Sequence, residues 1–343
     1  MSYRIALNFE DGVTRVIHCT AGETVLDAAF RQRINLPMDC ADGVCGTCKC
    51  RAESGRYTLG EDYIEDALSA GEAAAGLVLT CQMRPDSDCA LAVPATSAAC
   101  KTGSVPFQAT LASVRAHADA ALELTLQPVG EVPDFLPGQY VNIAVSGSGQ
   151  ARAYSFSSPP GASELTFLIK RVPGGLMSAC LDAATPGQRF DLSGPLGSFY
   201  LREVTRPLLM LAGGTGLAPF LSMLAQLEAS GCAQPVHLVY GATRGADLVL
   251  VERLQALAER VAWFDVTTCV VDPAAGHPRT GYVTDHLPAQ ALHDGDVDVY
   301  LCGPPPMVEA VRAHFQQRGL VPANFHCEKF VANTAAPVQE RAA

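Results

Sequence analysis

Residues 40–48 read Cys40-Ala41-Asp42-Gly43-Val44-Cys45-Gly46-Thr47-Cys48, and Cys81 follows 33 residues later. Three cysteines spaced by four and then two residues, with a distant fourth, form the plant-type [2Fe-2S] ligand pattern. A two-iron cluster needs four thiolates around two tetrahedral irons, and a short loop can supply three of them. The fourth ligand then comes from a remote strand. The predicted metal ligands are Cys40, Cys45, Cys48 and Cys81.

Other metal sites fit this spacing less well. A structural zinc site also takes four thiolates, but usually as two short Cys-x2–4-Cys pairs. A Rieske centre needs histidines on one iron, and the sequence has no Cys-x-His pair. Cys50 is a possible competing ligand, although the spacing favours Cys48. Gly43 and Gly46 lie between the ligands, where a tightly curled loop requires positive φ angles.

Composition limits the class of protein. A chain of 343 residues is long enough for two or three domains. The net charge of −11 argues against nucleic-acid binding. The N-terminus lacks the apolar region of a signal peptide, and no apolar run reaches the roughly 20 residues that span a bilayer. We therefore expect no membrane association and a cytoplasmic location, where thirteen cysteines are explained by a cluster and buried thiols rather than by disulfides.

The first hundred residues predict a small mixed fold. Residues 3–9 and 13–18, joined by an Asp-Gly turn, have the pattern of a β-hairpin. A short helix over 25–30 leads into the cysteine loop, and the whole arrangement resembles the β-grasp ferredoxin domain. Further expected elements are a strand over 51–59, a helix over 64–68 and a strand over 77–81 that delivers Cys81. We place this domain at residues 1–98 and a linker at 99–104, where small and polar residues predominate.

The rest of the chain predicts two further domains and a tail. Residues 105–203 are rich in short strands separated by turn signals, which favours an antiparallel β-barrel. Residues 204–331 alternate apolar strands with amphipathic helices, which indicates a doubly wound parallel sheet. Residues 332–343 are expected to be a disordered tail. The expected barrel strands are 108–114, 121–126, 139–145, 165–171 and 190–193. The expected strands of the last domain are 207–212, 236–240, 262–271 and 297–302, with helices at 219–230, 248–260 and 307–319.

The barrel segment carries an Arg-x-Tyr-Ser motif, Arg152-Ala153-Tyr154-Ser155. With the rest of the layout it resembles the flavin motif of the ferredoxin-NADP reductase superfamily. The resemblance implies that Arg152 pairs with the FAD pyrophosphate, that Tyr154 packs on the isoalloxazine, and that Ser155 hydrogen-bonds near N5. A guanidinium suits phosphate oxygens and an aromatic face suits a flavin ring. The alternative is an ordinary strand end with a surface arginine.

A glycine-rich turn and a terminal aromatic support the flavin assignment. Gly174-Gly175-Leu176-Met177-Ser178 precedes a helix predicted over 176–183, whose first N–H groups suit an anion. In the superfamily this Gly-x-x-Ser element contacts the pyrophosphate, which makes Gly175, Leu176, Met177 and Ser178 candidate FAD ligands. Near the C-terminus, Phe330 resembles the aromatic that covers the second flavin face, and it is equally compatible with a plain core position.

Two motifs predict a nicotinamide site. The strand ending at residue 212 runs into Gly213-Gly214-Thr215-Gly216, which resembles the turn of the reductase superfamily rather than a Gly-x-Gly-x-x-Gly fingerprint. Cys302-Gly303-Pro304 follows the last predicted strand, where open α/β sheets place their ligands. It resembles the family's Cys-Gly-Pro box, which implies that Cys302 lies beside nicotinamide C4; the alternative is a buried strand-end thiol. Ser155 and Cys302 are the predicted catalytic residues.

Cofactor choice depends on the loop over residues 241–247. An adenosine 2′-phosphate requires a cluster of basic side chains there, and the loop offers one arginine, Arg244, and one acid. We favour NADH for this reason.

The order of the three domains resembles the reductase family of the benzoate, anthranilate and toluate 1,2-dioxygenases. Shared stretches include residues 7–14, 37–40, 154–158, 194–202 and 297–304. The resemblance implies electron flow from NADH to FAD, then to a [2Fe-2S] cluster, and on to a Rieske-type terminal oxygenase. NADH gives two electrons as hydride and a cluster accepts one at a time, so a flavin is required between them. Two alternatives remain: a reductase for a di-iron monooxygenase, and a redox-sensing or zinc-binding module without turnover.

Overall fold

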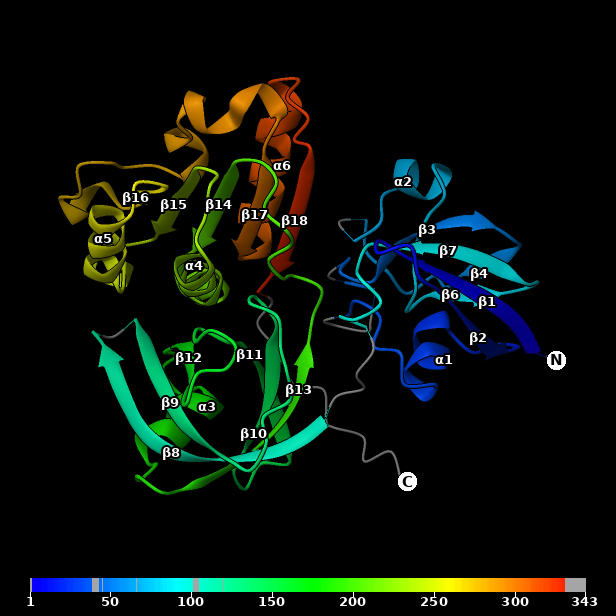
Figure 1. Ribbon diagram of the computed structural model, residues 1–343, viewed down its shortest axis with the longest axis horizontal. Coiled ribbons are helices and arrows are strands. Elements are labelled where there is room, and N and C mark those ends of the chain that lie inside the picture. The colour runs from blue at the N-terminus through cyan, green and yellow to red at the C-terminus, as the bar shows by residue number, and fades with distance from the viewer. Residues whose placement is uncertain are drawn as a thin grey trace. The chain divides into compact units, whose positions relative to one another are not determined.

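The computed structural model describes residues 2–38, 43–44, 46–65, 67–100, 105–118 and 120–330. The chain forms two compact units, which we describe separately (Figure 1). One contains residues 1–105 with 194–198, and the other contains residues 106–193 with 199–343. The predicted tail, 332–343, and most of the predicted linker, 99–104, lie outside the described residues.

A five-stranded mixed sheet forms the first unit, in the order β2-β1-β7-β3-β5. β1 pairs antiparallel with β2, as the hairpin prediction requires, and parallel with β7. A two-stranded ribbon, β4 with β6, completes the strands that are described in this unit. The bounds are β1 Ser2–Phe9, β2 Thr14–Thr20, β3 Lys49–Ser54, β4 Tyr57–Leu59, β5 Leu77–Leu79, β6 Met83–Pro85 and β7 Cys89–Val93.

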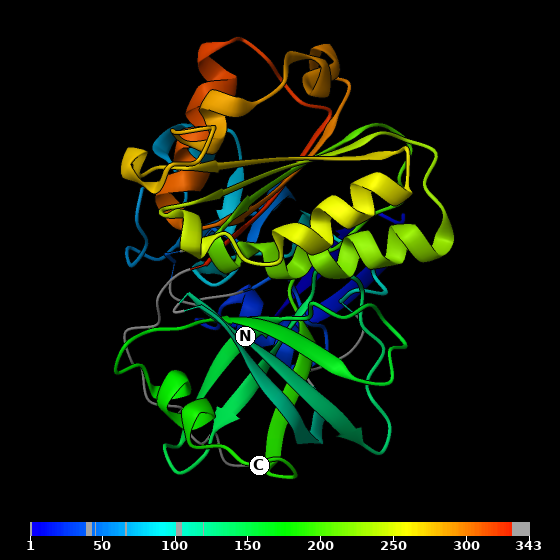
Figure 2. The ribbon, with the colours of Figure 1, turned by 90° about the vertical axis from the view of Figure 1, so that its left-hand side faces the viewer.

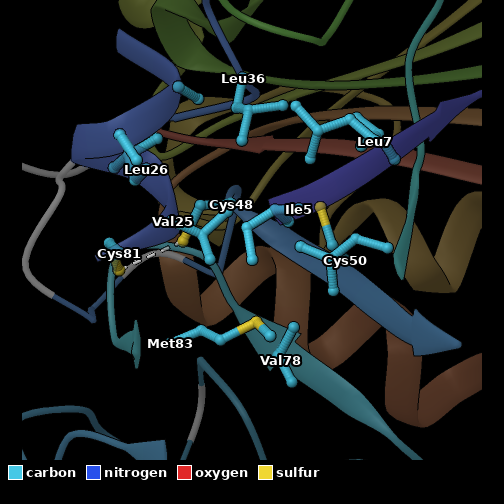
Figure 3. Packing of buried hydrophobic residues seen from close by; sticks show 14 of the residues in the cluster. Ile5, Leu7, Val25, Leu26, Leu36, Cys48, Cys50, Val78, Cys81 and Met83 are labelled. Atoms are coloured by element: carbon cyan, nitrogen blue, oxygen red, sulfur yellow. Dashed lines mark hydrogen bonds between the residues drawn. The ribbon is translucent and has the colours of Figure 1, made fainter. Parts of the chain in front are cut away.

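Helix α1, Val25–Arg31, forms where the sequence predicts it. Thr24 is the N-cap, and its side chain accepts a hydrogen bond from the Asp27 N–H, which satisfies a donor that the first helical turn leaves unpaired. One face of the helix is buried against the sheet. Figure 3 shows Val25 and Leu26 beside the strand residues of this core. This packing anchors the segment that leads into the cysteine loop.

Several details of the first unit differ from the prediction. The strand expected over 51–59 is divided into two strands, β3 and β4, which belong to different sheets. The described residues of the range 64–68 are not helical, although the Leu68 N–H donates to the Ile64 carbonyl at 3.3 Å. The helix lies later, at α2, Ala70–Ala74, because Ser69 and Glu72 form a capping box that starts it there. The strand expected over 77–81 ends at Leu79, and the residue that follows Thr80, Cys81, lies in a turn.

The second unit begins with a six-stranded sheet in the order β11-β10-β13-β8-β9-β12. A bridge between Phe156 and Phe167 joins the two ends of this order, so the sheet closes into the predicted barrel. Helix α3 lies at one end of the barrel (Figure 1). The bounds are β8 Val105–His117, β9 Ala121–Val129, β10 Tyr140–Val145, β11 Gln150–Ser155, β12 Leu165–Lys170, α3 Leu176–Asp182 and β13 Arg189–Leu196.

A parallel sheet in the order β16-β15-β14-β17-β18 follows, as the alternating pattern predicts. Figure 2 shows α4 and α5 against one face of this sheet and α6 against the other. Each face has its own buried core, which explains why the strands are apolar on both sides. The prediction missed β18. The bounds are β14 Leu208–Gly213, α4 Ala218–Ser230, β15 Val236–Ala242, α5 Val251–Arg260, β16 Phe264–Val270, β17 Asp298–Gly303, α6 Pro305–Gln317 and β18 Asn324–Lys329.

Short 3-10 segments complete the sheet's connections: η1 Gly214–Leu217, η2 Gly245–Asp247, η3 Pro273–Ala275, η4 Val283–His286 and η5 Ala289–Gly295. Among the described helices, none combines the length and the apolar character needed to cross a membrane.

Candidate functional site

Cys48 and Cys81 face each other in the first unit. Their Sγ atoms are 3.2 Å apart, both residues are buried, and neither forms a disulfide (Figure 3). The separation exceeds the roughly 2.05 Å of a disulfide bond. Two buried sulfurs brought together without a covalent bond are a donor set that suits soft metal centres, so these residues fit an iron–sulfur cluster. The other two predicted ligands, Cys40 and Cys45, lie outside the described residues.

The glycines of the cysteine loop have the predicted backbone conformation. Gly43 has φ of +74° and Gly46 has φ of +77°. A Cβ on Gly43 would overlap the backbone of Asp62 and Tyr63. The loop therefore requires glycine for both its conformation and its close packing.

Cys50, the possible competing ligand, occupies a different position. It lies in β3, is 2% exposed, and is directed away from Cys48 and Cys81 (Figure 3). Burial raises the pKa of the Cys50 thiol, which keeps it protonated at neutral pH. The position of Cys50 supports the prediction, made from the cysteine spacing, that Cys48 rather than Cys50 is the cluster ligand.

The Arg-x-Tyr-Ser motif ends strand β11 in the barrel. Arg152 donates from one guanidinium nitrogen to the Gln150 side-chain oxygen at 2.7 Å and from the other to the Ala151 carbonyl at 2.9 Å. Burial raises the pKa of Tyr154, so its hydroxyl stays neutral. Ser155 is buried and Ala153 is exposed. A guanidinium, an aromatic ring and a buried hydroxyl on one short strand fit a flavin dinucleotide.

The glycine-rich turn leads into α3 as predicted. Its N-cap is Gly175, and no side chain caps the helix there. Ser178 is buried, and its hydroxyl accepts a hydrogen bond from the Val172 N–H at 2.9 Å, which holds the turn against the helix. Met177 is buried in the barrel core, whereas Leu176 is 38% exposed. The role of these four residues as FAD ligands stays a prediction.

The glycine turn after β14 fits closely against the Cys-Gly-Pro box. β14 pairs with β17, which brings the two motifs to the same edge of the sheet. A Cβ at Gly216 would overlap the carbonyl oxygen of Cys302, and a Cβ at Gly213 would meet Met307 and Pro304. The absence of side chains on these glycines therefore lets the two backbones pack closely, and the binding of a pyrophosphate at this edge stays a prediction.

Gly216→Ala should lower the free energy of unfolding by about 1–3 kcal/mol, because the added methyl must displace backbone rather than a flexible side chain. We also expect weaker NADH binding, since the two motifs move apart. Thermal unfolding and flavin reduction at increasing NADH concentrations measure both effects. Gly71→Ala is the matched control, because a Cβ there meets nothing within 4 Å. An unchanged unfolding temperature in Gly216→Ala would contradict the packing described here.

A buried carboxylate that the sequence did not predict lies between the Arg-x-Tyr-Ser motif and the Cys-Gly-Pro box. Glu328, on β18, is 5% exposed. Its Oε2 accepts a hydrogen bond from Ser155 Oγ at 3.4 Å and lies 3.8 Å from Cys302 Sγ. The predicted catalytic residues thus meet at one acidic group. Glu328 belongs to the segment Glu328-Lys329-Phe330, and its place two positions before the predicted aromatic was the available signal.

Phe330 follows β18 directly. Its N–H donates to the Gly303 carbonyl at 2.9 Å, which ties the terminal segment to the Cys-Gly-Pro box. The ring is partly buried against the core beneath α4 and α5. This contact agrees with the core position, and the role as a flavin cover stays a prediction.

Three family models match consecutive parts of the chain. The "2Fe-2S iron-sulfur cluster binding domain" matches residues 8–86, the "Oxidoreductase FAD-binding domain" matches residues 112–200, and the "Oxidoreductase NAD-binding domain" matches residues 210–313. The predicted fold class and the predicted cofactors, a [2Fe-2S] cluster, FAD and NADH, are thereby confirmed.

Relatives of known function match nearly the whole chain. The toluate 1,2-dioxygenase electron transfer component of Pseudomonas putida is 53% identical over 97% of this chain and 100% of its own length. The 2-halobenzoate 1,2-dioxygenase electron transfer component of Burkholderia cepacia is 48% identical over 96% and 98%. The anthranilate 1,2-dioxygenase electron transfer component of Acinetobacter baylyi is 39% identical over 98% and 99%.

A solved structure agrees with this assignment. The cytochrome P450 reductase of Amycolatopsis superposes with a TM-score of 0.70 at 32% identity, over 96% of this chain and 99% of its own. The family model that matches each of the three modules thus names its redox cofactor, and the protein is an oxidoreductase. With these motifs in place along its full length, the chain belongs to the family of electron-transfer components of aromatic-acid 1,2-dioxygenases.

Proposed function

We propose that this protein reduces the Rieske-type terminal oxygenase of a 1,2-dioxygenase that acts on benzoate or a close aromatic acid. It carries electrons from NADH, by way of FAD and a [2Fe-2S] cluster, to that oxygenase. The observation that supports this most is the 53% identity to the toluate component over the full length of that protein. The cytoplasm is the proposed compartment, since none of the described cysteines forms a disulfide.

The sequence motifs and the geometry of the described residues support the following proposed roles. Cys40, Cys45, Cys48 and Cys81 hold the cluster. Arg152 binds the FAD pyrophosphate, and its contact with Gln150 orients the guanidinium. Tyr154 packs on the flavin ring. The turn 213–216 and the box 302–304 bind NADH at the carboxyl edge of the parallel sheet.

The flavin, when bound, supplies the capacity to accept a hydride and to release electrons singly. The protein's part is position and electrostatics. Ser155 presents a hydroxyl from β11, and Glu328 orients it because its Oε2 accepts a hydrogen bond from that hydroxyl at 3.4 Å. Cys302, 0% exposed, excludes water from the same place. No general base is required in this arrangement.

The proposed partner is tested by mixing the purified holoprotein with candidate terminal oxygenases. We expect NADH oxidation that depends on the aromatic acid when a benzoate-type Rieske oxygenase is present. Turnover with a di-iron hydroxylase, and with no benzoate-type oxygenase, would support the rival reductase instead.

The non-turnover alternative is tested by an absorption spectrum. We expect flavin bands together with [2Fe-2S] bands that bleach on addition of NADH. A colourless protein that contains zinc would contradict the proposed function.

A further inference from the structure

Strand β18, which carries Glu328, stands at the edge of the parallel sheet. It is the last strand in the order, so β17 is its one strand neighbour among the described residues. The parallel register places Cys302 beside Glu328 and Gly303 beside Lys329. An edge strand leaves one row of its backbone N–H and C=O groups without a strand partner. The contacts of its side chains therefore decide how firmly β18 is held.

The side chains at the end of β18 alternate between the two faces of the sheet, as in any strand. Glu328 faces Ser155 and Cys302, as described above. Lys329, the next residue, faces α6, which covers the opposite side of the sheet (Figure 2). Its Nζ lies 2.8 Å from Oε1 of Glu309 on that helix. Adjacent residues thus contact the reacting centre and α6.

This ion pair is the last of three contacts that join β18 to α6. They involve every second residue of the strand and every third residue of the helix, so one face of the strand lies along one face of the helix. The contacts are Phe325 with Phe315, whose ring centroids are 6.1 Å apart, Cys327 Sγ with a guanidinium nitrogen of Arg312 at 3.4 Å, and Lys329 with Glu309.

The two charges of the pair differ in burial. The Lys329 side chain is 5% exposed, whereas that of Glu309 is 40% exposed. A lysine is almost never buried this deeply unless it is paired, because its ammonium loses hydration on leaving water. An apolar side chain of similar volume is often at least as stabilising in such a place. The retained charge therefore favours a role in fixing geometry rather than in packing alone.

We propose that Lys329 is a positioning residue for the reduction of FAD by NADH, because its ion pair with Glu309 fixes the end of β18 against α6 and so holds the Glu328 carboxylate at Ser155. The inference rests on the proposed function and adds to it a residue that acts through Glu328. Helix α6 begins at Pro305, directly after the Cys-Gly-Pro box, so the ion pair also links that box to the terminal segment.

The first test is Lys329→Met in the FAD-loaded protein. Methionine removes the ammonium and keeps an unbranched side chain, and thermal unfolding checks that the fold survives. A displacement of about 1 Å at a reacting centre can slow a reaction about 100-fold, so we expect flavin reduction at saturating NADH to slow about 10- to 100-fold. The NADH concentration that gives half of the limiting rate should change by less than about threefold, because NADH binding is not altered. Single-turnover stopped-flow absorbance measures both quantities.

Glu309→Gln and Glu228→Gln are matched variants. Glu228, on α4, is also 40% exposed, and its Oε1 lies 2.7 Å from Arg260 on α5, on the other face of the sheet. Glu309→Gln should slow flavin reduction, as Lys329→Met does. Glu228→Gln should leave the rate within about twofold, since an exposed ion pair contributes little to stability. If Lys329→Met does not fold, Glu309→Gln carries the comparison.

Two readouts separate positioning from a general weakening of the fold. In a Glu328→Ala protein, adding Lys329→Met should change the rate by less than about twofold, because the group that Lys329 positions is already absent. The visible circular dichroism of bound FAD requires no turnover. It should change in the same direction in Lys329→Met and Glu328→Ala, and it should stay unchanged in Glu228→Gln.

Three outcomes would overturn the proposal. An unchanged rate in folded Lys329→Met would show that the ion pair does not position Glu328. Equal losses on adding Lys329→Met with and without Glu328 would show that Lys329 acts on the fold as a whole. An unmodified protein that binds FAD without being reduced by NADH would overturn the proposed function and this inference with it, whereas in the first two outcomes the unmodified protein is still reduced.

Discussion

Cys81→Ala should abolish reduction of cytochrome c by NADH and leave reduction of the flavin by NADH intact. Cys81 Sγ lies 3.2 Å from Cys48 Sγ, so its loss removes one of two sulfurs that the fold brings together. The flavin and nicotinamide modules have their own buried cores, which do not include residues of the first unit. Iron and acid-labile sulfide analysis, together with stopped-flow absorbance of the flavin, measures the two results separately.

Cys50→Ala is the matched control for this experiment. Cys50 is as deeply buried as Cys48, at 2% exposed, and has the same side chain, but it is directed away from the pair. The control should keep its iron and its cytochrome c reductase activity. Loss of the cluster in Cys50→Ala with retention in Cys81→Ala would contradict the ligand assignment. Loss of flavin reduction in a folded Cys81→Ala protein would contradict the independence of the modules.

Ser155→Ala should slow flavin reduction by NADH about 100- to 1000-fold, the usual cost of removing one positioned hydrogen-bonding group from a reacting centre. The Ser155 hydroxyl is buried and is oriented by Glu328. Alanine removes the hydroxyl and leaves the Glu328 carboxylate without that donor. Single-turnover stopped-flow at saturating NADH measures the rate, and titration with ADP checks that nucleotide binding survives.

Ser157→Ala provides the matched control for the reaction. Ser157 is also buried, two residues further along, but its hydroxyl bonds to the Thr166 side chain at 2.9 Å within the barrel. Its loss should leave the rate within a few-fold of the unmodified protein, since it is a hydrogen bond of the fold worth about 1 kcal/mol. Equal rates in both variants would show that Ser155 has no part in the transfer.

Local patterns predicted much of this molecule. The positive φ of Gly43 and Gly46 follows from their place between metal ligands. The parallel sheet was predicted from apolar strands that alternate with amphipathic helices. This alternation can be recognised in the sequence. The helix expected over 64–68 was wrong because apolar residues there suggested a helical face. The capping box of Ser69 and Glu72 decides where the helix begins.

The burial of Glu328 could not be predicted from local sequence patterns. A glutamate is ordinarily exposed, so nothing local marks this one as 5% exposed. Its burial is accounted for by Ser155, which is 173 residues distant in the chain, and by Cys302 on the neighbouring strand. The pairing of Arg244 with Asp247 is a similar case. Both residues are evident in the sequence, but their mutual hydrogen bonds depend on a turn that Tyr240 anchors from the core.

The amino-acid sequence by itself determined the three modules, the order of the cofactors and the chemical type of each ligand, because cysteine spacing and glycine turns are encoded by neighbouring residues. Only the tertiary structure decided which buried polar groups meet beside Ser155 and which charges pair in the loop over residues 241–247. These outcomes depend on contacts between remote strands and on burial, since a charged group is retained in the interior only where the fold supplies its partners.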